Sequence, residues 1–147
     1  MDEGDCVKMQ PKADLVPMKP GLVPRQWQID AARALGTHAR LGTKRMISSA
    51  ATGVGKGDLI AAMIVKAVWQ GRRTLFVVHR DFLLSDVYER VMKIEPALYG
   101  GRVQGQFNEV DRHAIFASLQ TVKDEERCRS IGKVDWTFCD EAHTMLC

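Results

Sequence analysis

The chain has 147 residues, of which 46% are hydrophobic and 27% charged, and its formal net charge is +3. That composition is typical of a single globular domain and excludes a largely disordered chain. The small positive excess permits a nucleic-acid partner but does not by itself argue for one.

Signals for export or membrane insertion are not visible in the sequence. The first residues are polar and acidic, which argues against a signal peptide, and the longest apolar stretch, residues 59–69, is interrupted by Lys66 and is too short to cross a bilayer. The four cysteines form no Cys-x-x-Cys pair, and Cys139 is expected to be buried inside an apolar strand. These features favour a reducing, cytoplasmic setting without a membrane partner.

Helical and extended patterns alternate along the chain. The spacing of apolar residues predicts helices at residues 25–35, 58–70, 82–94 and 122–129. Apolar runs predict strands at residues 44–50, 74–79, 114–118 and 136–139, with a further short strand within 99–108. Gly36 and Gly71 are expected to end the first two helices. This order predicts an α/β fold, a parallel sheet with helices on both faces.

A glycine-rich segment, Ala50-Ala51-Thr52-Gly53-Val54-Gly55-Lys56, lies between the first expected strand and the second expected helix. Glycines let backbone N–H groups face an anion, and the amino end of the following helix adds a favourable dipole. Lys56 is then placed to reach the β- and γ-phosphates of a nucleotide. The simpler alternative is a glycine turn followed by a surface lysine.

The residues after Lys56 depart from the phosphate-loop pattern. Gly57 stands where a serine or threonine hydroxyl would bind magnesium. Asp58 comes next, and we expect it chiefly to favour the amino end of the helix, with a water-mediated metal contact as the alternative. This departure predicts weaker magnesium dependence, not the loss of nucleotide binding.

A second signal, Asp140-Glu141-Ala142-His143, follows the apolar run at residues 136–139. An acidic pair at the end of a strand suits a nucleotide-bound magnesium ion and its attacking water. We therefore expect Asp140 to bind the metal and Glu141 to orient or deprotonate the water, although an acidic turn is the simpler interpretation of the pair alone. Ligands bind off the carboxyl ends of parallel strands, so the two signals together predict one nucleoside-triphosphate site.

In this order the residues resemble the first RecA-like domain of superfamily 2 helicases and translocases, which are phosphate-loop NTPases. The likeness is to the DEAH-type group that includes the helicase subunits of type III restriction enzymes and related phage and bacterial DNA helicases. Residues 50–56 are similar to motif I and residues 140–143 to motif II. Three weaker matches keep the family order, at residues 22–26, 77–83 and 117–121. The resemblance covers about residues 22–145.

The resemblance implies roles for residues that composition and spacing do not assign. It implies ATP and Mg²⁺ as cofactors, with Gln26 recognising adenine, residues 51–58 around the phosphates, and His143 linking the nucleotide state to domain closure. It also implies contacts to a nucleic-acid backbone, DNA in preference to RNA, from four side chains: His79, Arg80, Gln120 and Thr121. On the residues alone, Gln26 is equally well a polar group on a helix surface, and the other four are solvated loop positions.

The resemblance also implies parts that the sequence does not contain. The family has a motif III strand between the motif I and motif II strands, and a second RecA-like domain with arginine fingers. We therefore expect residues 1–20 to be a flexible lead-in and residues 21–147 to be the amino-terminal part of an incomplete ATP-binding domain. The second domain would come in cis or from another chain. A gap in the sheet, poor stability and negligible ATP hydrolysis by the isolated chain are further expectations.

The leading hypothesis is thus an ATP-dependent nucleic-acid helicase or translocase, represented by its first motor domain. A non-catalytic nucleotide- or nucleic-acid-binding module, or a decayed remnant, is the main alternative, and Gly57 is the residue that favours it. A metabolic phosphate-loop kinase is a third alternative. The Ala-His pair that follows the acidic residues argues against the kinase.

Overall fold

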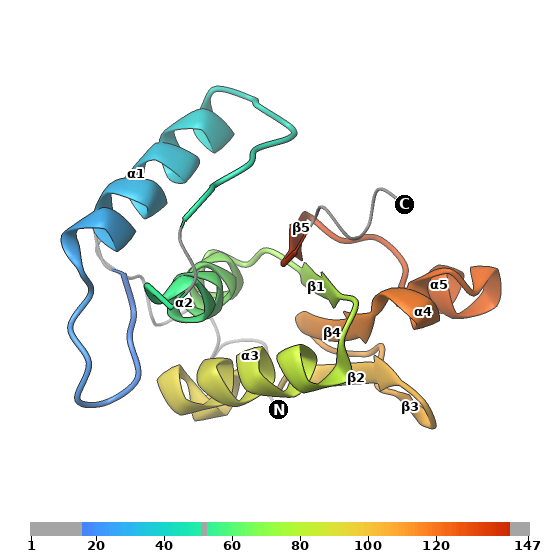
Figure 1. Cartoon of the computed structure of the whole chain (residues 1–147). Helices are drawn as coiled ribbons and strands as arrows, with labels where there is room; N and C mark the ends of the chain where they lie inside the picture. Colours follow the sequence, from blue (N-terminus) through green and yellow to red (C-terminus); the bar gives the residue numbers. More distant parts are fainter. Residues whose placement is uncertain (1–15, 51–52, 142–147) are drawn as a thin grey trace.

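The computed structural model describes residues 16–50 and 53–141, which form one mixed sheet with helices on both faces (Figure 1). In chain order the elements are α1 (Gln26–Arg40), α2 (Lys56–Trp69), β1 (Thr74–Val78), α3 (Asp81–Ile94), the 3₁₀ helix η1 (Pro96–Leu98), β2 (Gly101–Gln104), β3 (Phe107–Asn108), β4 (Ala114–Ser118), α4 (Leu119–Val122), α5 (Glu125–Ile131) and β5 (Trp136–Cys139). No helix in these two ranges has the length and apolar character that a bilayer crossing requires.

The strand order is β3-β2-β4-β1-β5. Strands β2, β4, β1 and β5 run parallel, and β3 folds back antiparallel on β2 as a short hairpin. The predicted α/β fold is therefore confirmed, with a mostly parallel sheet. All five residues of β1 and of β4 are buried, as expected for parallel strands that helices cover on both faces.

Two apolar layers hold the helices to the sheet. On one face, α2 and α3 pack over Phe76, Val78 and Phe116. On the opposite face, Val77 and Ile115 pack with α5 and with the half-buried side chains of α4. Helix α1 lies outside the first layer and packs on α2. Figure 1 shows α2 and α3 on one side of the strands and α4 and α5 on the other.

Strand β5 is only half covered. Its register pairs Phe76 with Phe138 and Val77 with Cys139. Phe138 is half-buried against the core under α2, whereas Cys139 faces the opposite side and is exposed. The prediction that Cys139 is buried is therefore wrong, because β5 is the edge strand of the described sheet and no helix covers that face of it. Partial burial still raises the pKa of the Cys139 thiol.

Residues 44–50 form no strand, which corrects the sequence prediction. Their side chains are mostly exposed, and Ile47 is 94% exposed. A strand persists when a neighbour satisfies its backbone hydrogen bonds, and within the described residues no strand lies beyond β5 to pair with this segment. The expected gap between a motif I strand and a motif II strand stays a prediction.

Two helix boundaries also differ from the sequence prediction. Helix α1 continues through Gly36 to Arg40, because the left-handed glycine that follows its end is Gly42, with φ +87°. The helix expected at 122–129 is instead the pair α4 and α5. The break comes at Asp124, whose side chain caps α5 by accepting a hydrogen bond from the backbone N–H of Arg127 at 3.1 Å.

Candidate functional site

The glycine-rich loop leads directly into helix α2. Gly53 and Gly55 have φ values of +79° and +99°, a region that side-chain-bearing residues rarely adopt. Lys56 follows as the first residue of α2 and is partly buried. Ala51 and Thr52, which were predicted to belong to the same loop, lie outside the described residues. The described half of the loop thus has the tight backbone and the helix entry that a phosphate cradle needs.

Helix α1 clamps this loop from the side. Gln28 is 3% exposed, and its Nε2 donates to the Gly55 carbonyl at 2.9 Å while its Oε1 accepts from the Arg25 N–H at 2.8 Å. The Arg25 guanidinium donates to the Val54 carbonyl at 3.1 Å. A Cβ on Gly55 would lie 2.8 Å from Gln28 Nε2 and would force this amide to shift away from the Gly55 carbonyl. The start of α1 and the loop therefore form one hydrogen-bonded unit.

The glutamine that reaches the loop is Gln28, whereas sequence reasoning selected Gln26. Gln26 is exposed, and its Nε2 donates to Asp30 Oδ1 at 2.9 Å on the helix surface. Gln28 lies one turn before the buried Ala32, on the apolar side of the helix. A polar residue in that position was the sequence feature that could have identified it. The assignment of adenine recognition to Gln26 stays a prediction.

Gly57 and Asp58 face an arginine of helix α3. Arg90 NH1 donates to Asp58 Oδ1 at 2.6 Å, and Arg90 Nε donates to Asp86 Oδ2 at 2.9 Å. A Cβ on Gly57 would lie 3.2 Å from Arg90 Nε. Partial burial lowers the pKa of Arg90, but the hydrogen bonds to Asp86 and Asp58 more than offset it, so this pKa is raised. Asp58 thus has a cationic partner that neither sequence interpretation named, and the guanidinium occupies the space beside position 57.

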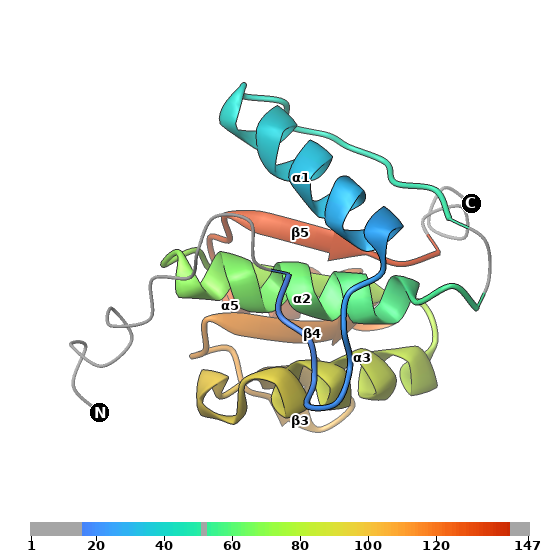
Figure 2. The same cartoon turned by 90° about the vertical axis from the view of Figure 1, so that its left-hand side faces the viewer.

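The acidic pair follows β5. Asp140 Oδ1 accepts the backbone N–H of Glu141 at 2.8 Å, and Glu141 has φ +50°, an uncommon value for a residue with a side chain. Figure 2 shows that the carboxyl end of β5 and the amino end of α2 lie at the same edge of the molecule. His143 lies outside the described residues. That Lys56 and the acidic pair meet on one triphosphate stays a prediction.

The carboxylates at this edge suit a metal that is bound through a nucleotide. Within residues 16–50 and 53–141, no group of three or more His, Cys, Asp or Glu side chains is arranged to hold a metal ion. Magnesium at nucleotide sites is commonly held by one or two carboxylates together with substrate phosphates and water. The assignment of magnesium to Asp140 stays a prediction.

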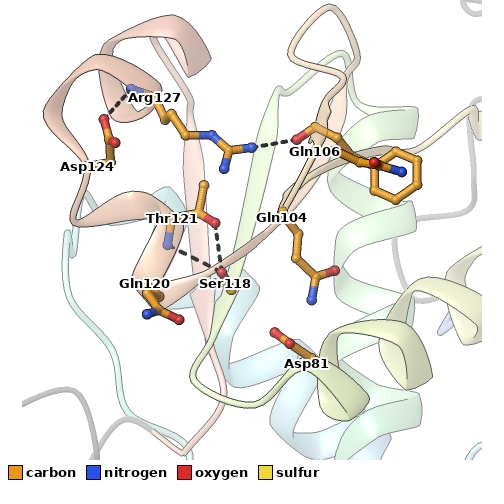
Figure 3. Close-up of a pocket in the computed structure, with 10 residues that line it drawn as sticks. Asp81, Gln104, Gln106, Ser118, Gln120, Thr121, Asp124 and Arg127 are labelled. Carbon is orange, nitrogen blue, oxygen red and sulfur yellow. Dashed lines mark hydrogen bonds between the residues drawn. The ribbon is translucent and has the colours of Figure 1, made fainter.

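A second site-like feature is a cleft of about 590 Å³ between the β2–β3 hairpin and the end of β4 (Figure 3). Its walls are Asp81, residues 104–107, Ser118, Gln120, Thr121, Asp124 and Arg127. Of the four residues expected to touch a nucleic-acid backbone, Gln120 and Thr121 line this cleft. His79 and Arg80 are exposed at the end of the adjacent strand β1 and do not line it.

The fold and the glycine loop define a RecA-like α/β domain. The sequence matches the ResIII family, described as type III restriction enzyme, res subunit, over residues 21–146, and the chain belongs to this family. Membership implies a superfamily 2 helicase-like ATPase domain, which confirms that part of the sequence interpretation. The search of curated proteins finds no match.

Proposed function

We propose that this chain is the ATP-binding part of a motor domain that couples ATP hydrolysis to movement on nucleic acid, with DNA as the favoured substrate. The observation that carries the proposal is the clamped loop: Gln28 and Arg25 hold the glycine loop at the amino end of α2. Membership of the ResIII family supports an ATPase role for that loop. The carboxyl end of β5, which the acidic pair follows in sequence, lies at the same edge as the amino end of α2 (Figure 2).

Each residue has a defined task under this proposal. Lys56 neutralises the β- and γ-phosphates, since a compact ammonium suits a cluster of phosphate oxygens. Backbone N–H groups around Gly53 and Gly55 surround the same oxygens, while the Gln28 amide keeps the loop in its bound shape. Asp140 holds the nucleotide-bound magnesium ion, and Glu141 orients the attacking water.

The nucleic acid is placed across the ends of β1 and β4. Ligands of open α/β sheets bind off the carboxyl ends of the strands, and His79 and Arg80 follow β1 while Gln120 and Thr121 follow β4. Arg80 is exposed and supplies a cation for a phosphate. Thr121 is buried and hydrogen-bonded to Ser118, so it shapes this surface more than it donates to a ligand.

The experiment is calorimetric titration of the full chain with MgATP. Lys56→Ala is expected to abolish binding, because the phosphates lose the ammonium at the amino end of α2. Lys93→Ala, which removes an exposed lysine at the far end of α3, is the matched control and should leave the affinity unchanged. Equal affinities for the wild-type chain and the Lys56→Ala variant would overturn the proposal.

A non-catalytic nucleotide-binding module remains the second candidate, and Gly57 is the observation that favours it. Glycine has no hydroxyl to offer magnesium at position 57, and the Arg90 side chain lies in the space beside it. Titration with ATP in the presence of EDTA separates the two candidates. Binding that is independent of magnesium, without hydrolysis when DNA is added, would favour the module.

A further inference from the structure

The cleft beside the β2–β3 hairpin has walls that are fixed by internal hydrogen bonds. Ser118 Oγ and Thr121 Oγ1 are 2.8 Å apart and joined by a hydrogen bond. The Arg127 guanidinium donates to the Phe107 carbonyl at 2.6 Å, which ties α5 to the hairpin, and Asp124 caps the same helix. These hydroxyl, guanidinium and carboxylate groups are engaged in holding the walls (Figure 3).

Three glutamine side-chain amides line the same cleft without a hydrogen bond to the described residues. Within the part of the chain that the structure describes, the side-chain amides of Gln104, Gln106 and Gln120 make no hydrogen bond to protein. They are three of the seven glutamines in the sequence. Figure 3 shows Gln104 extending from the hairpin side and Gln120 from the side of α4. Each amide offers both a donor and an acceptor to a ligand.

The charges in the cleft disfavour a phosphate and favour a neutral ligand. Asp81 and Asp124 place two carboxylates in the walls, and the single cation, Arg127, already bonds a backbone carbonyl. Carboxylates repel phosphate oxygens, whereas free amides suit a planar group with donors and acceptors on its edge. Phe107 also lines the cleft and is 46% exposed, which adds aromatic surface beside the amides.

We infer that this cleft binds a nucleobase of single-stranded nucleic acid and that its amides select adenine. Glutamine pairs with adenine through one donor and one acceptor, and base edges become accessible when a strand is unpaired. The cleft volume of about 590 Å³ falls within the range of ~300–1,000 Å³ that is usual for ligand sites. The inference rests on the proposed function, because exposed Arg80 at the end of β1 would supply the neighbouring phosphate contact.

Fluorescence anisotropy with labelled oligo-dA, oligo-dT and oligo-dC tests the inference on the full chain. We expect oligo-dA to bind at least about fivefold more tightly than the other two, the lower end of discrimination by a paired amide. The double substitution Gln104→Ala with Gln120→Ala should remove this preference. Gln70→Ala is the matched control, since Gln70 is an exposed glutamine at the carboxyl end of α2 and does not line the cleft.

The possible outcomes separate this inference from the proposed function. Equal affinity for all three oligonucleotides, or a preference that survives the double substitution, overturns base recognition and leaves backbone binding intact. Arg80→Ala is expected to weaken all three by a similar factor, because a phosphate contact is independent of sequence. No binding of any oligonucleotide by a chain that still binds MgATP overturns the nucleic-acid role and this inference with it.

Discussion

The strands of the sheet differ in how completely neighbouring elements cover them. We call the part around β1 and β4 the closed side of the sheet and the part around β5 the open side. Strands β1 and β4 are buried along their whole length, with strands on both sides and helices on both faces. Strand β5 alternates between half-buried and exposed residues, and residues 44–50 form no strand. The sequence of β5, Trp-Thr-Phe-Cys, is about as apolar as those of β1 and β4, whereas residues 44–50 contain Lys44, Arg45 and two serines. An apolar run is therefore buried only where neighbouring elements are present to cover it.

The proposed nucleic-acid and nucleotide roles fall on different sides of the sheet. The cleft and the residues proposed to contact nucleic acid lie on the closed side, at the ends of β1 and β4, whereas the acidic pair follows β5 on the open side. Substitutions on the closed side are expected to act mainly on stability when they reach the core. Substitutions of the acidic pair that follows β5 are expected to act mainly on nucleotide binding.

The largest expected effect is that of Phe116→Ala in β4. Phe116 is fully buried, with its ring centroid 6.2 Å from that of Phe76 and 5.2 Å from that of Tyr88. We expect a loss of about 3–5 kcal/mol in the free energy of unfolding, measured by urea denaturation. Phe138→Ala in β5 is the matched substitution on the open side and should cost less than half as much, because Phe138 is only half-buried. Equal losses of unfolding free energy from the two substitutions would contradict this difference in burial between β4 and β5.

Arg73 connects the segment before β4 to the segment before β5. Its replacement by alanine is expected to have the next largest effect on the free energy of unfolding. Its guanidinium donates to four backbone carbonyls: Val110 at 2.6 Å, Arg112 at 3.1 Å, Ile131 at 2.5 Å and Lys133 at 2.8 Å. Arg73→Ala leaves these acceptors without their donor, and we expect a cost of about 2–3 kcal/mol in urea denaturation. Arg73→Lys should recover only a small part, since an ammonium cannot reproduce the planar fork. Full recovery by lysine would show that charge, and not geometry, is what holds the connections together.

The sequence predicts most of the fold because its signals are local. Strands β1, β4 and β5 and helices α2 and α3 lie within a residue or two of the predicted positions, since apolar periodicity and glycine stops decide them. Residues 44–50 and Cys139 were misjudged because their burial depends on neighbours that periodicity does not report. Gln28 and Arg90 were missed for a similar reason, since each acts on the glycine loop from a different helix.

Loss of the loop clamp should have an intermediate effect, and it falls on nucleotide binding. Gln28→Ala leaves the Gly55 carbonyl and the Arg25 N–H without their amide partner, so the loop is held less firmly at the amino end of α2. We expect MgATP affinity to fall about tenfold, equivalent to about 1.4 kcal/mol, in calorimetric titration. Gln26→Ala removes an exposed amide from the same helix and is the matched control. A larger loss from Gln26→Ala would instead support the original prediction that Gln26 recognises adenine.

The smallest expected effect is the coupling between Gly57 of α2 and Arg90 of α3. Gly57→Ser brings a Cβ to about 3.2 Å from Arg90 Nε, so the guanidinium must shift and its pairs with Asp58 and Asp86 are disturbed. We expect Gly57→Ser alone to lower the free energy of unfolding by about 1 kcal/mol. The double variant Gly57→Ser with Arg90→Ala should lose less than the sum of the two single losses.

The same double variant reports on magnesium. With Arg90 removed, the new serine hydroxyl has room to adopt the position that a phosphate loop gives to its metal ligand. The ratio of ATP affinities with and without magnesium should then rise above that of the wild-type chain, while Arg90→Ala alone leaves it unchanged. Strictly additive losses of stability together with an unchanged ratio would mean that Arg90 does not determine the glycine at position 57. The departure from the phosphate-loop pattern would then belong to the nucleotide chemistry itself, which favours the non-catalytic module.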